Sequence, residues 1–519
     1  MKVIVAREAA ALLRNGWTIA ASGFGGFGHP ETLTDAVEKR FLAEGRPRDL
    51  TLLFAASNGD RRVRGMNHFG NEGMVRRVIA GGWRGTPRLG ALAIQGKIEA
   101  YNWPQGVICQ LFRAIAAGQP GLVTRTGLDT FVDPRHDGGR LNNATAKDLV
   151  RLLRLDGEEY LLYPAMRLDC ALIRATSADA LGNLTLEHEA FPQDMLAIAQ
   201  AARNSGGIVI AQVKRVVEAR TLDPTRVRVP GMLVDYVVVA ESEAQHWMSF
   251  GEKHNPAYLG DRSAPLLQPA PGAQSDVNRV IQRRAYLELL RFPGAIVNLG
   301  MGIPAGIATI AREQGYANFT LTIESGVSGG VAAEELSFGA ASHPESVIDQ
   351  AAQFDFYAGG GLDLGFLGML QIDASGNVNV GRMQEQIIGT GGFIDIAQGA
   401  RAICFLGTFT AGGLRIEASD GRLRILEEGK LPKIVPSVDQ MAFNAKWARH
   451  RGRRVLYITE RAVFGLEERG LVLLEVAPGI DPRRQVIERL PPGVCVPERP
   501  ASMAKSIFGG PFAAAEHQG

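Results

Sequence analysis

The chain has 519 residues, of which 46% are apolar and 21% charged, and its 56 basic residues nearly balance its 54 acidic ones. This length is too great for one hydrophobic core, so two or more domains are expected. The even charge gives no support for nucleic-acid or membrane binding, and the four widely spaced cysteines indicate neither a zinc site nor a disulfide framework. Because no apolar run resembles a signal peptide or a membrane span, a cytoplasmic location is predicted.

The N-terminal segment predicts alternating helices and strands. A short amphipathic helix is expected within residues 3–14, a buried strand at 17–22, and a helix after Pro30. The turn between strand and helix, residues 23–30, is Gly-rich and matches G-x-G-x-x-G, which suits anions. No acidic residue ends a second strand about 20 residues later, so the match does not favour a nicotinamide dinucleotide.

A further strand is predicted at 52–56, and a helix is predicted to begin at Gln105, directly after Pro104. The Gln105 side chain could direct an amide into a pocket, or it could be an ordinary polar residue at a helix start. Residues 124–145 are polar and Gly-rich, which predicts long loops.

The second half of the chain repeats the first. Asp169 and Asp179 precede a Gly-Asn turn at residues 182–183, and Asp363 and Asp373 precede the turn at 376–377 with the same spacing. We therefore predict two similar open α/β domains, residues 1–250 and 276–519, joined by a Pro- and Ala-rich linker at 251–275. The first domain carries an insertion at about 60–150, which contains Gln105.

The stretch FTLTIESGVSGG, residues 319–330, places Glu324 at the end of a predicted strand and before several glycines. Ligands of α/β folds bind at the carboxyl ends of strands. A second Gly-rich loop, Gly389-Thr390-Gly391-Gly392-Phe393, could supply backbone N–H donors to an oxyanion. Together they suit nucleophilic catalysis on an activated acyl group. The alternatives are that Glu324 is a general base or lies at an ordinary turn, and that the loop merely precedes a helix.

Five motifs taken in this order resemble those of family I coenzyme A transferases, in particular the single-chain acetate/propionate and 3-ketoacid CoA-transferases, and the resemblance covers nearly the whole chain. They are SGFGGFGHP at 22–30, WPQG at 103–106, NLGMGIP at 298–304, ESGVSGG at 324–330 and GTGGF at 389–393. The resemblance implies two similar α/β domains with the active site between them.

The resemblance also implies the roles of individual residues. Glu324 would be the nucleophile of a ping-pong reaction and would form a glutamyl-CoA thioester, while Gly391, Gly392 and Gln105 would contact the reacting carbonyl. The residues expected to contact CoA are Gly389, Thr390, Gly391, Gly392, Phe393 and Gly360, and those expected to contact the acyl group are Gly25, Gly26, Phe27 and Gln105.

The partners implied by the resemblance are an acyl-CoA and a short-chain acid: acetate, propionate, butyrate or a 3-ketoacid. No metal or redox cofactor is expected, because CoA enters as a thioester substrate. A homo-oligomer, dimer or tetramer, is predicted.

The chain departs from the family at two places. The two-chain and mitochondrial-type members usually have Ser-Glu-Asn-Gly at the nucleophile, whereas this chain has Ile323-Glu324-Ser325-Gly326, which favours the acetate/propionate branch over a strict succinate-dependent 3-ketoacid enzyme. Glu334 and Glu335 stand where related chains have Pro and Gly, so the shape of the acyl pocket is left open. Two alternative functions also stay open: an acyl-CoA thioester hydrolase on the same fold, and a non-catalytic sensor of phosphate-bearing ligands.

Overall fold

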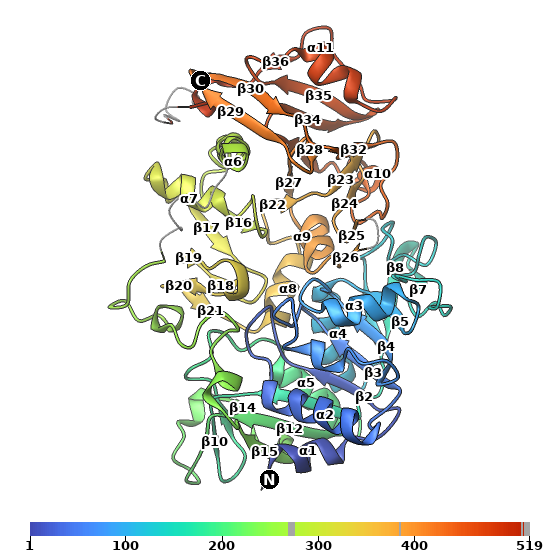
Figure 1. Ribbon diagram of the computed structural model, residues 1–519, viewed down its shortest axis with the longest axis vertical. Helices are drawn as coiled ribbons and strands as arrows, with labels where there is room; N and C mark the ends of the chain where they lie inside the picture. Colours follow the sequence, from blue (N-terminus) through green and yellow to red (C-terminus); the bar gives the residue numbers. More distant parts are fainter. Residues whose placement is uncertain (268–275, 384–385, 510–511, 513–519) are drawn as a thin grey trace. The chain divides into compact units, whose positions relative to one another are not determined.

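The computed structural model describes residues 1–267, 276–383, 386–509 and 512 (Figure 1). The chain forms two compact units. The first comprises Met1–Leu266, Ile323–Phe356 and Glu385–Asp395, and the second comprises Leu267–Thr322, Tyr357–Gln384 and Ile396–Gly519. Two segments of the sequence's second half therefore cluster with its first half. The predicted domain bounds at residues 250 and 276 stay a prediction. Residues 268–275 of the predicted linker lie outside the described residues.

The first unit contains a parallel sheet in the order β1-β15-β12-β9-β2-β3-β4-β5. Most of its strands are short apolar runs, as expected for a sheet covered on both faces. Their bounds are β1 Lys2–Val3, β2 Thr18–Ala21, β3 Leu50–Phe54, β4 Val75–Ala80, β5 Glu99–Asn102, β9 Cys170–Arg174, β12 Ile208–Val213 and β15 Tyr236–Val239.

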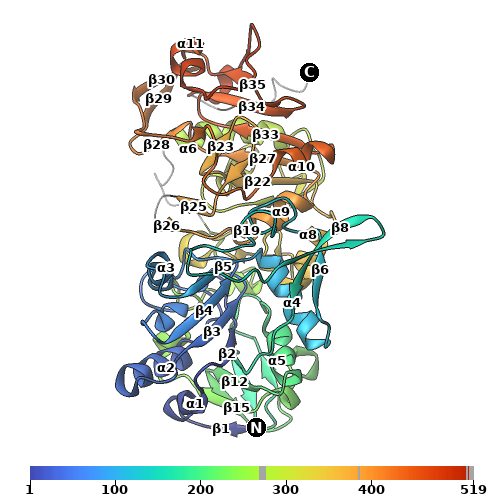
Figure 2. The same ribbon diagram turned by 90° about the vertical axis from the view of Figure 1, so that its right-hand side faces the viewer.

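Helices cover both faces of this sheet (Figure 2). Helices α1, α2 and α3 contribute Ala9, Leu33 and Leu89 to one apolar core with Leu52 and Val78 of the strands, and α4 and α5 lie on the opposite face. The bounds are α1 Ala6–Leu12, α2 Glu31–Glu44, α3 Pro87–Ile94, α4 Gln105–Ala116 and α5 Met195–Asn204. The helices predicted within 3–14, after Pro30 and at Gln105 are thus confirmed.

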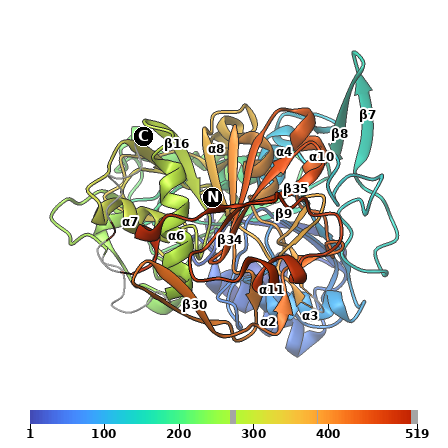
Figure 3. The same ribbon diagram turned by 90° about the horizontal axis from the view of Figure 1, so that it is seen from above.

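Two small sheets accompany the main sheet of the first unit. One has the order β13-β10-β11-β14 and the other β6-β8-β7, and the β7–β8 hairpin projects outward (Figure 3). The bounds are β6 Gly121–Thr124, β7 Arg151–Leu155, β8 Glu158–Pro164, β10 Ser177–Asp179, β11 Leu184–Thr185, β13 Arg215–Val217 and β14 Val227–Val229.

The second unit contains strands in the order β17-β16-β22-β27-β33-β34-β35-β36. Helix α6 lies beside α7 (Figure 3) and packs against β27 and β33. The strand bounds are β16 Ala295–Leu299, β17 Phe319–Thr322, β22 Leu364–Gly368, β27 Ala402–Leu406, β33 Arg454–Ile458, β34 Ala462–Glu467, β35 Gly470–Val476 and β36 Ala501–Ser502. The helices are α6 Asp276–Leu289, α7 Gly306–Glu313, α10 Ala445–His450 and α11 Pro482–Gln485. No helix among the described residues is long and apolar enough to cross a membrane.

The internal repeat is confirmed by strand order. The run β15-β12-β9-β2-β3 in the first unit matches β33-β27-β22-β16-β17 in the second. The repeated aspartates make the same bonds: Asp169 accepts a hydrogen bond from Thr18 N at 2.9 Å, and Asp363 accepts one from Ile296 N at 2.9 Å. The chain therefore has two similar open α/β halves, as predicted.

A buried ionic cluster attaches α2 to the loop that follows β3. His68 lies between Glu31, at 3.0 Å, and Glu38, at 2.5 Å. Burial lowers the pKa of His68, but the hydrogen bonds and charges of the two glutamates outweigh it and raise the pKa to about 9. Burial raises the pKa values of both glutamates, but their bonds to His68 outweigh it and lower each to about 2.

These shifts predict how stability depends on pH. The His68 contribution is fully present below its ordinary pKa of 6.5 and is lost as pH rises through about 9. The glutamate contributions are present above 4.5 and are lost as pH falls through about 2. We expect His68→Asn to remove on the order of 2 kcal/mol at pH 6 and much less at pH 9.5. Urea unfolding at the two pH values measures this, and an equal loss at both would contradict it.

Candidate active site

Glu324 lies in a tight turn between β17 and β18 (Val327–Ser328). The turn is closed by hydrogen bonds from Ile323 N to Val327 O, at 2.8 Å, and from Gly326 N to Ile323 O, at 3.0 Å. The Glu324 side chain is half-buried. The predicted strand with a carboxylate just beyond its end is confirmed.

The turn that carries Glu324 is connected to the Gly-rich turn at residues 23–30 through the segment around Gly339. Ser325 Oγ donates a hydrogen bond to Gly339 O at 2.5 Å, and a Cβ atom added to Gly339 would lie 2.6 Å from the Phe24 ring. Phe24 in turn stacks on Phe338 with ring centroids 6.1 Å apart. These contacts bring the residues around 324, 339 and 24 together within the first unit.

The predicted acyl contacts Gly25 and Gly26 lie on this turn. Gly25 has a φ of +58°, where glycine is favoured, and Gly26 O accepts a hydrogen bond from Phe250 N at 2.9 Å. Phe27 is 1% exposed and packs against Phe191 with ring centroids 5.1 Å apart. Its ring thus belongs to the hydrophobic core, and its contact with the acyl group stays a prediction.

Gly26 leaves no room for a side chain. A Cβ atom there would lie 2.2 Å from Leu336 O, whereas one at Gly90, inside α3, would meet nothing within 4 Å. We expect Gly26→Ala to lower the free energy of unfolding by about 1–3 kcal/mol. It should also lower activity, because the backbone of residues 336–339, which packs near the Glu324 turn, would be displaced. Gly90→Ala, the matched control, should raise stability by about 0.5–1 kcal/mol. Urea midpoints of the two variants measure the difference, and a neutral Gly26→Ala would refute this geometry.

The second Gly-rich loop is joined by hydrogen bonds to the carboxyl ends of β4 and β5. Trp83 N donates to Ile388 O at 2.9 Å, and Gly391 N donates to Gly81 O at 2.8 Å. Thr390 donates through N and Oγ1 to Asn102 Oδ1, at 3.0 and 3.2 Å. Gly389 and Gly391 have φ values of +75° and +54°, which favour glycine. The loop is therefore built into the first unit's sheet edge.

These hydrogen bonds determine which N–H groups of the loop could still donate to a ligand. The Gly391 N–H already donates to Gly81 O, and the expected contact of Gly391 with the reacting carbonyl stays a prediction. Among the described residues, the N–H of buried Gly392 has no hydrogen-bond partner, and neither does Gln105 Nε2, whose side chain is 3% exposed. Buried donors without partners are costly unless a ligand satisfies them.

Gln105 and the loop are bonded directly. Gln105 N donates to Gly391 O at 3.0 Å, and the next residue, Gly106, donates through N to Asp395 Oδ2 at 3.1 Å. Asp395 lies in α9 (Phe393–Gly399), which begins just after the loop. Burial raises the pKa of Asp395 to about 8, and the charge of Glu324 raises it further. The charge of Glu324 therefore acts on Asp395, which connects the start of α4, where Gln105 lies, to the 389–392 loop.

The remaining predicted residues lie elsewhere or are buried. Phe393 is 5% exposed at the start of α9. Gly360 belongs to the second unit, where its N–H donates to Tyr357 O at 3.0 Å just beyond α8 (Gln350–Ala358). The described residues contain no group of three or more side chains that could hold a metal ion.

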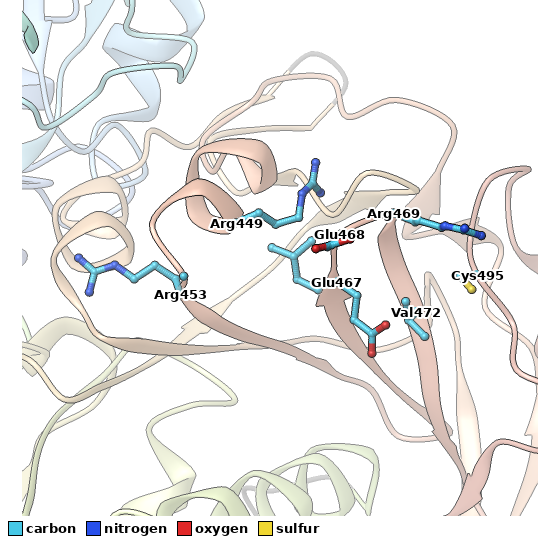
Figure 4. Close-up of a pocket in the computed structure, with 9 residues that line it drawn as sticks. Arg449, Arg453, Glu467, Glu468, Arg469, Val472 and Cys495 are labelled. Carbon is cyan, nitrogen blue, oxygen red and sulfur yellow. The ribbon is translucent and has the colours of Figure 1, made fainter.

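The second unit has a pocket of about 580 Å³ (Figure 4). Its lining comes from α10 and the residues just after it, the β34–β35 hairpin and Cys495, and Arg453 points away from the other labelled side chains. Glutamates 467 and 468 accompany its arginines, and it contains none of the predicted site residues. We assign it no part in the chemistry.

Three residues of the site were missed by sequence reasoning: Asn102, Gly81 and Asp395. The pair Gly81-Gly82 directly after a strand is a signal that could have been used, because glycines there permit close backbone approach. Asn102 ends a strand just before Trp103-Pro104. Asp395 carries no signal in one sequence, because its role comes from contact with Gly106, far away in the chain.

A repeated open α/β fold that carries a carboxylate turn, with buried amide donors that lack a partner among the described residues, suits an enzyme of acyl-group chemistry. The chain belongs to the coenzyme A transferase family. The family model for coenzyme A transferase matches residues 3–240, and the acetate CoA-transferase YdiF of Escherichia coli K12 is 42% identical over 498 residues, which cover 94% of this chain and 91% of that protein. The resemblance seen in the sequence is confirmed.

Two further relatives agree with this family. The caffeate CoA-transferase of Acetobacterium woodii is 41% identical over 495 residues, 94% of each chain. Crystal structures of the YdiF acyl-CoA transferase of E. coli O157:H7 superpose with TM-scores of 0.92 for the apoenzyme and 0.91 for a thioester complex with CoA, at 40% identity and covering 98% of this chain and 96% of theirs. The chain is therefore a CoA-transferase, which moves CoA between an acyl-CoA and a free acid.

Proposed function

We propose that this enzyme transfers CoA between short-chain acids by a ping-pong reaction in which Glu324 becomes a glutamyl-CoA thioester. The observation that supports it best is a half-buried carboxylate at a strand-end turn in the same unit as two buried amide donors, Gln105 Nε2 and Gly392 N, that have no partner among the described residues. The relative crystallised as a thioester complex with CoA also supports it.

In the first step, a carboxylate oxygen of Glu324 attacks the acyl-CoA carbonyl carbon. The negative charge that develops on the carbonyl oxygen is stabilised by hydrogen bonds from Gln105 and Gly392. The C–S bond then breaks, CoA leaves as thiolate, and an acyl-glutamyl anhydride remains.

In the second step, the CoA thiolate attacks the Glu324 carbonyl of the anhydride, and the first acid leaves as carboxylate. The glutamyl-CoA thioester is then attacked by the second carboxylate, and the same steps in reverse release the new acyl-CoA. Each step exchanges one activated carbonyl for another, so the residues need neither a metal nor a redox cofactor. Water has to be excluded from the intermediate, since hydrolysis would waste it.

The acids that we propose are acetate, propionate, butyrate and a 3-ketoacid. The acetate CoA-transferase among the relatives supports a small acid, and the caffeate CoA-transferase makes an aromatic acid a useful comparison. The predicted homo-oligomer, dimer or tetramer, stays a prediction.

Intact-mass spectrometry tests the intermediate. Protein incubated with acetyl-CoA alone should gain a covalent CoA adduct, and peptide mapping should place it on residue 324. The Glu324→Ala variant should gain none. A noncovalent mass shift only would support a sensor, and steady thiol release without an acceptor acid would support a thioester hydrolase.

A further inference from the structure

Asp395 is a buried carboxyl group without an ion-pair partner among the described residues. It is 3% exposed. Burial raises its pKa, the backbone N–H groups of Gly106, Asp395 and Val107 lower it, and the charge of Glu324 adds a smaller upward contribution. The mechanism above does not use Asp395. A buried carboxylate that faces another carboxylate is unfavourable, and such a group resists ionisation.

Asp395 joins the two elements that carry the unpaired amides. Its Oδ2 accepts a hydrogen bond from Gly106 N, next to Gln105, at 3.1 Å, and its helix begins directly after Gly392. The fit is close on both sides, because a Cβ atom added to Gly106 would lie 2.6 Å from Asp395 Oδ1 and 2.4 Å from the Phe354 ring. A change at Asp395 would therefore move Gln105 relative to the loop.

Among the described residues, the groups that most affect the ionisation of Asp395 include no basic side chain; backbone N–H groups favour its charged form, and burial outweighs them. Cys109 of α4 and Tyr163 of β8 are fully buried, and the pKa of each is raised by burial and by Asp395 among its neighbours. On α8, next to Phe354, Asp355 pairs with Arg113 and so uses that guanidinium. The charge of Glu324 also raises the pKa of Asp395.

We propose that Asp395 is a positioning residue, which holds the first turn of α4 and the 389–392 loop together as an uncharged carboxyl group, and that its ionisation impairs the site. A second negative charge would oppose both the oxyanion and the attack of Glu324, because electrostatic effects are strong in a water-poor site. The role rests on the proposed function, since it assumes that Gln105 and Gly392 stabilise that oxyanion. Burial holds the pKa of Asp395 near 8, so the effect falls in an accessible pH range.

The test compares kcat between pH 6 and 9.5 in wild-type protein, Asp395→Asn and Asp395→Ala, with acetyl-CoA as donor and propionate or butyrate, whichever reacts faster, as acceptor. Wild-type kcat should fall above pH 8 by about tenfold per pH unit. Asp395→Asn keeps an oxygen for Gly106 N and cannot ionise, so its kcat should vary by less than about threefold over this range. Asp395→Ala should be at least about tenfold slower than Asp395→Asn at pH 7, because the bond to Gly106 is lost.

Asp194→Asn is the matched control. Asp194 is also a buried aspartate, and burial raises its pKa to about 7, but no hydrogen bond joins it to Gln105 or to the 389–392 loop in the described structure. It should keep the wild-type fall above pH 8, and the circular dichroism of every variant should match wild type.

Three results would overturn the proposal: an alkaline fall in Asp395→Asn equal to that of wild type, a folded Asp395→Asn as slow as Asp395→Ala at pH 7, or removal of the fall by Asp194→Asn. A wild-type enzyme that transfers CoA but forms no adduct would overturn the glutamyl thioester instead, and the pH comparison would still decide the role of Asp395.

Discussion

Glu324→Gln should lose CoA transfer by at least about 1,000-fold in kcat, because an amide cannot form the anhydride and replaces the nucleophile with a group of the same shape. The turn that carries residue 324 is closed by backbone bonds, from Ile323 N and Gly326 N. These bonds do not depend on the side chain, so the variant should fold normally. Initial rates with acetyl-CoA as donor and propionate, butyrate or acetoacetate as acceptor measure the loss.

Glu324→Asp tests distance at the same position. Removing one methylene withdraws the oxygen by about 1.5 Å, and a misplacement of this size costs about 100-fold or more. Glu345→Gln is the matched control, since Glu345 is an exposed glutamate of the same segment. If either variant at 324 kept the wild-type rate, or if Glu345→Gln were equally impaired, Glu324 would not be the nucleophile.

Gln105→Ala should lower kcat by about 100- to 1,000-fold and leave the KM for acyl-CoA nearly unchanged, as expected for a donor that acts mainly on the transition state. The Nε2 group is buried without a partner among the described residues. Such a group costs about 1–3 kcal/mol in the free enzyme. The variant should therefore unfold at about the wild-type temperature, because loss of this cost offsets the small cavity.

Gln110→Ala is the control for Gln105→Ala. Gln110 lies on the same helix, but its Nε2 donates to Asp355 at 2.9 Å. It should keep full activity. A Gln105→Ala enzyme within about twofold of wild-type kcat, or one that lost stability while keeping activity, would show that the unpaired amide is not used in catalysis.

The internal repeat could be predicted because the same residues recur at the same spacing within short turns of both halves. Asp179 and Asp373 each accept hydrogen bonds from the backbone of their own turn, residues 181–183 and 375–377. Such bonds join near neighbours in the chain, so spacing in the sequence suffices to reveal them. The strand before Glu324 and the helix at Gln105 were predictable for the same reason.

The state of the individual amides was not predictable. Gly391 was expected to donate to the substrate, but its N–H donates to Gly81 O. Phe27 was expected to contact the acyl group, but it packs in an aromatic cluster with Phe191. In both cases a partner distant in sequence satisfies or covers the group. The clustering of 323–356 and 385–395 with the first half is likewise a matter of long-range contacts.

The amino-acid order alone determined the two related halves, the glycines that shape their turns and the carboxylate at position 324, because each depends on backbone preferences over a few residues. Only the tertiary structure decided that Gln105 and Gly392 keep N–H groups without a partner in the described part of the chain, and that Asp395 lies buried beside them. Those outcomes follow from hydrogen-bond pairing and desolvation between segments nearly 300 residues apart, such as the bond from Thr390 to Asn102, 288 residues earlier.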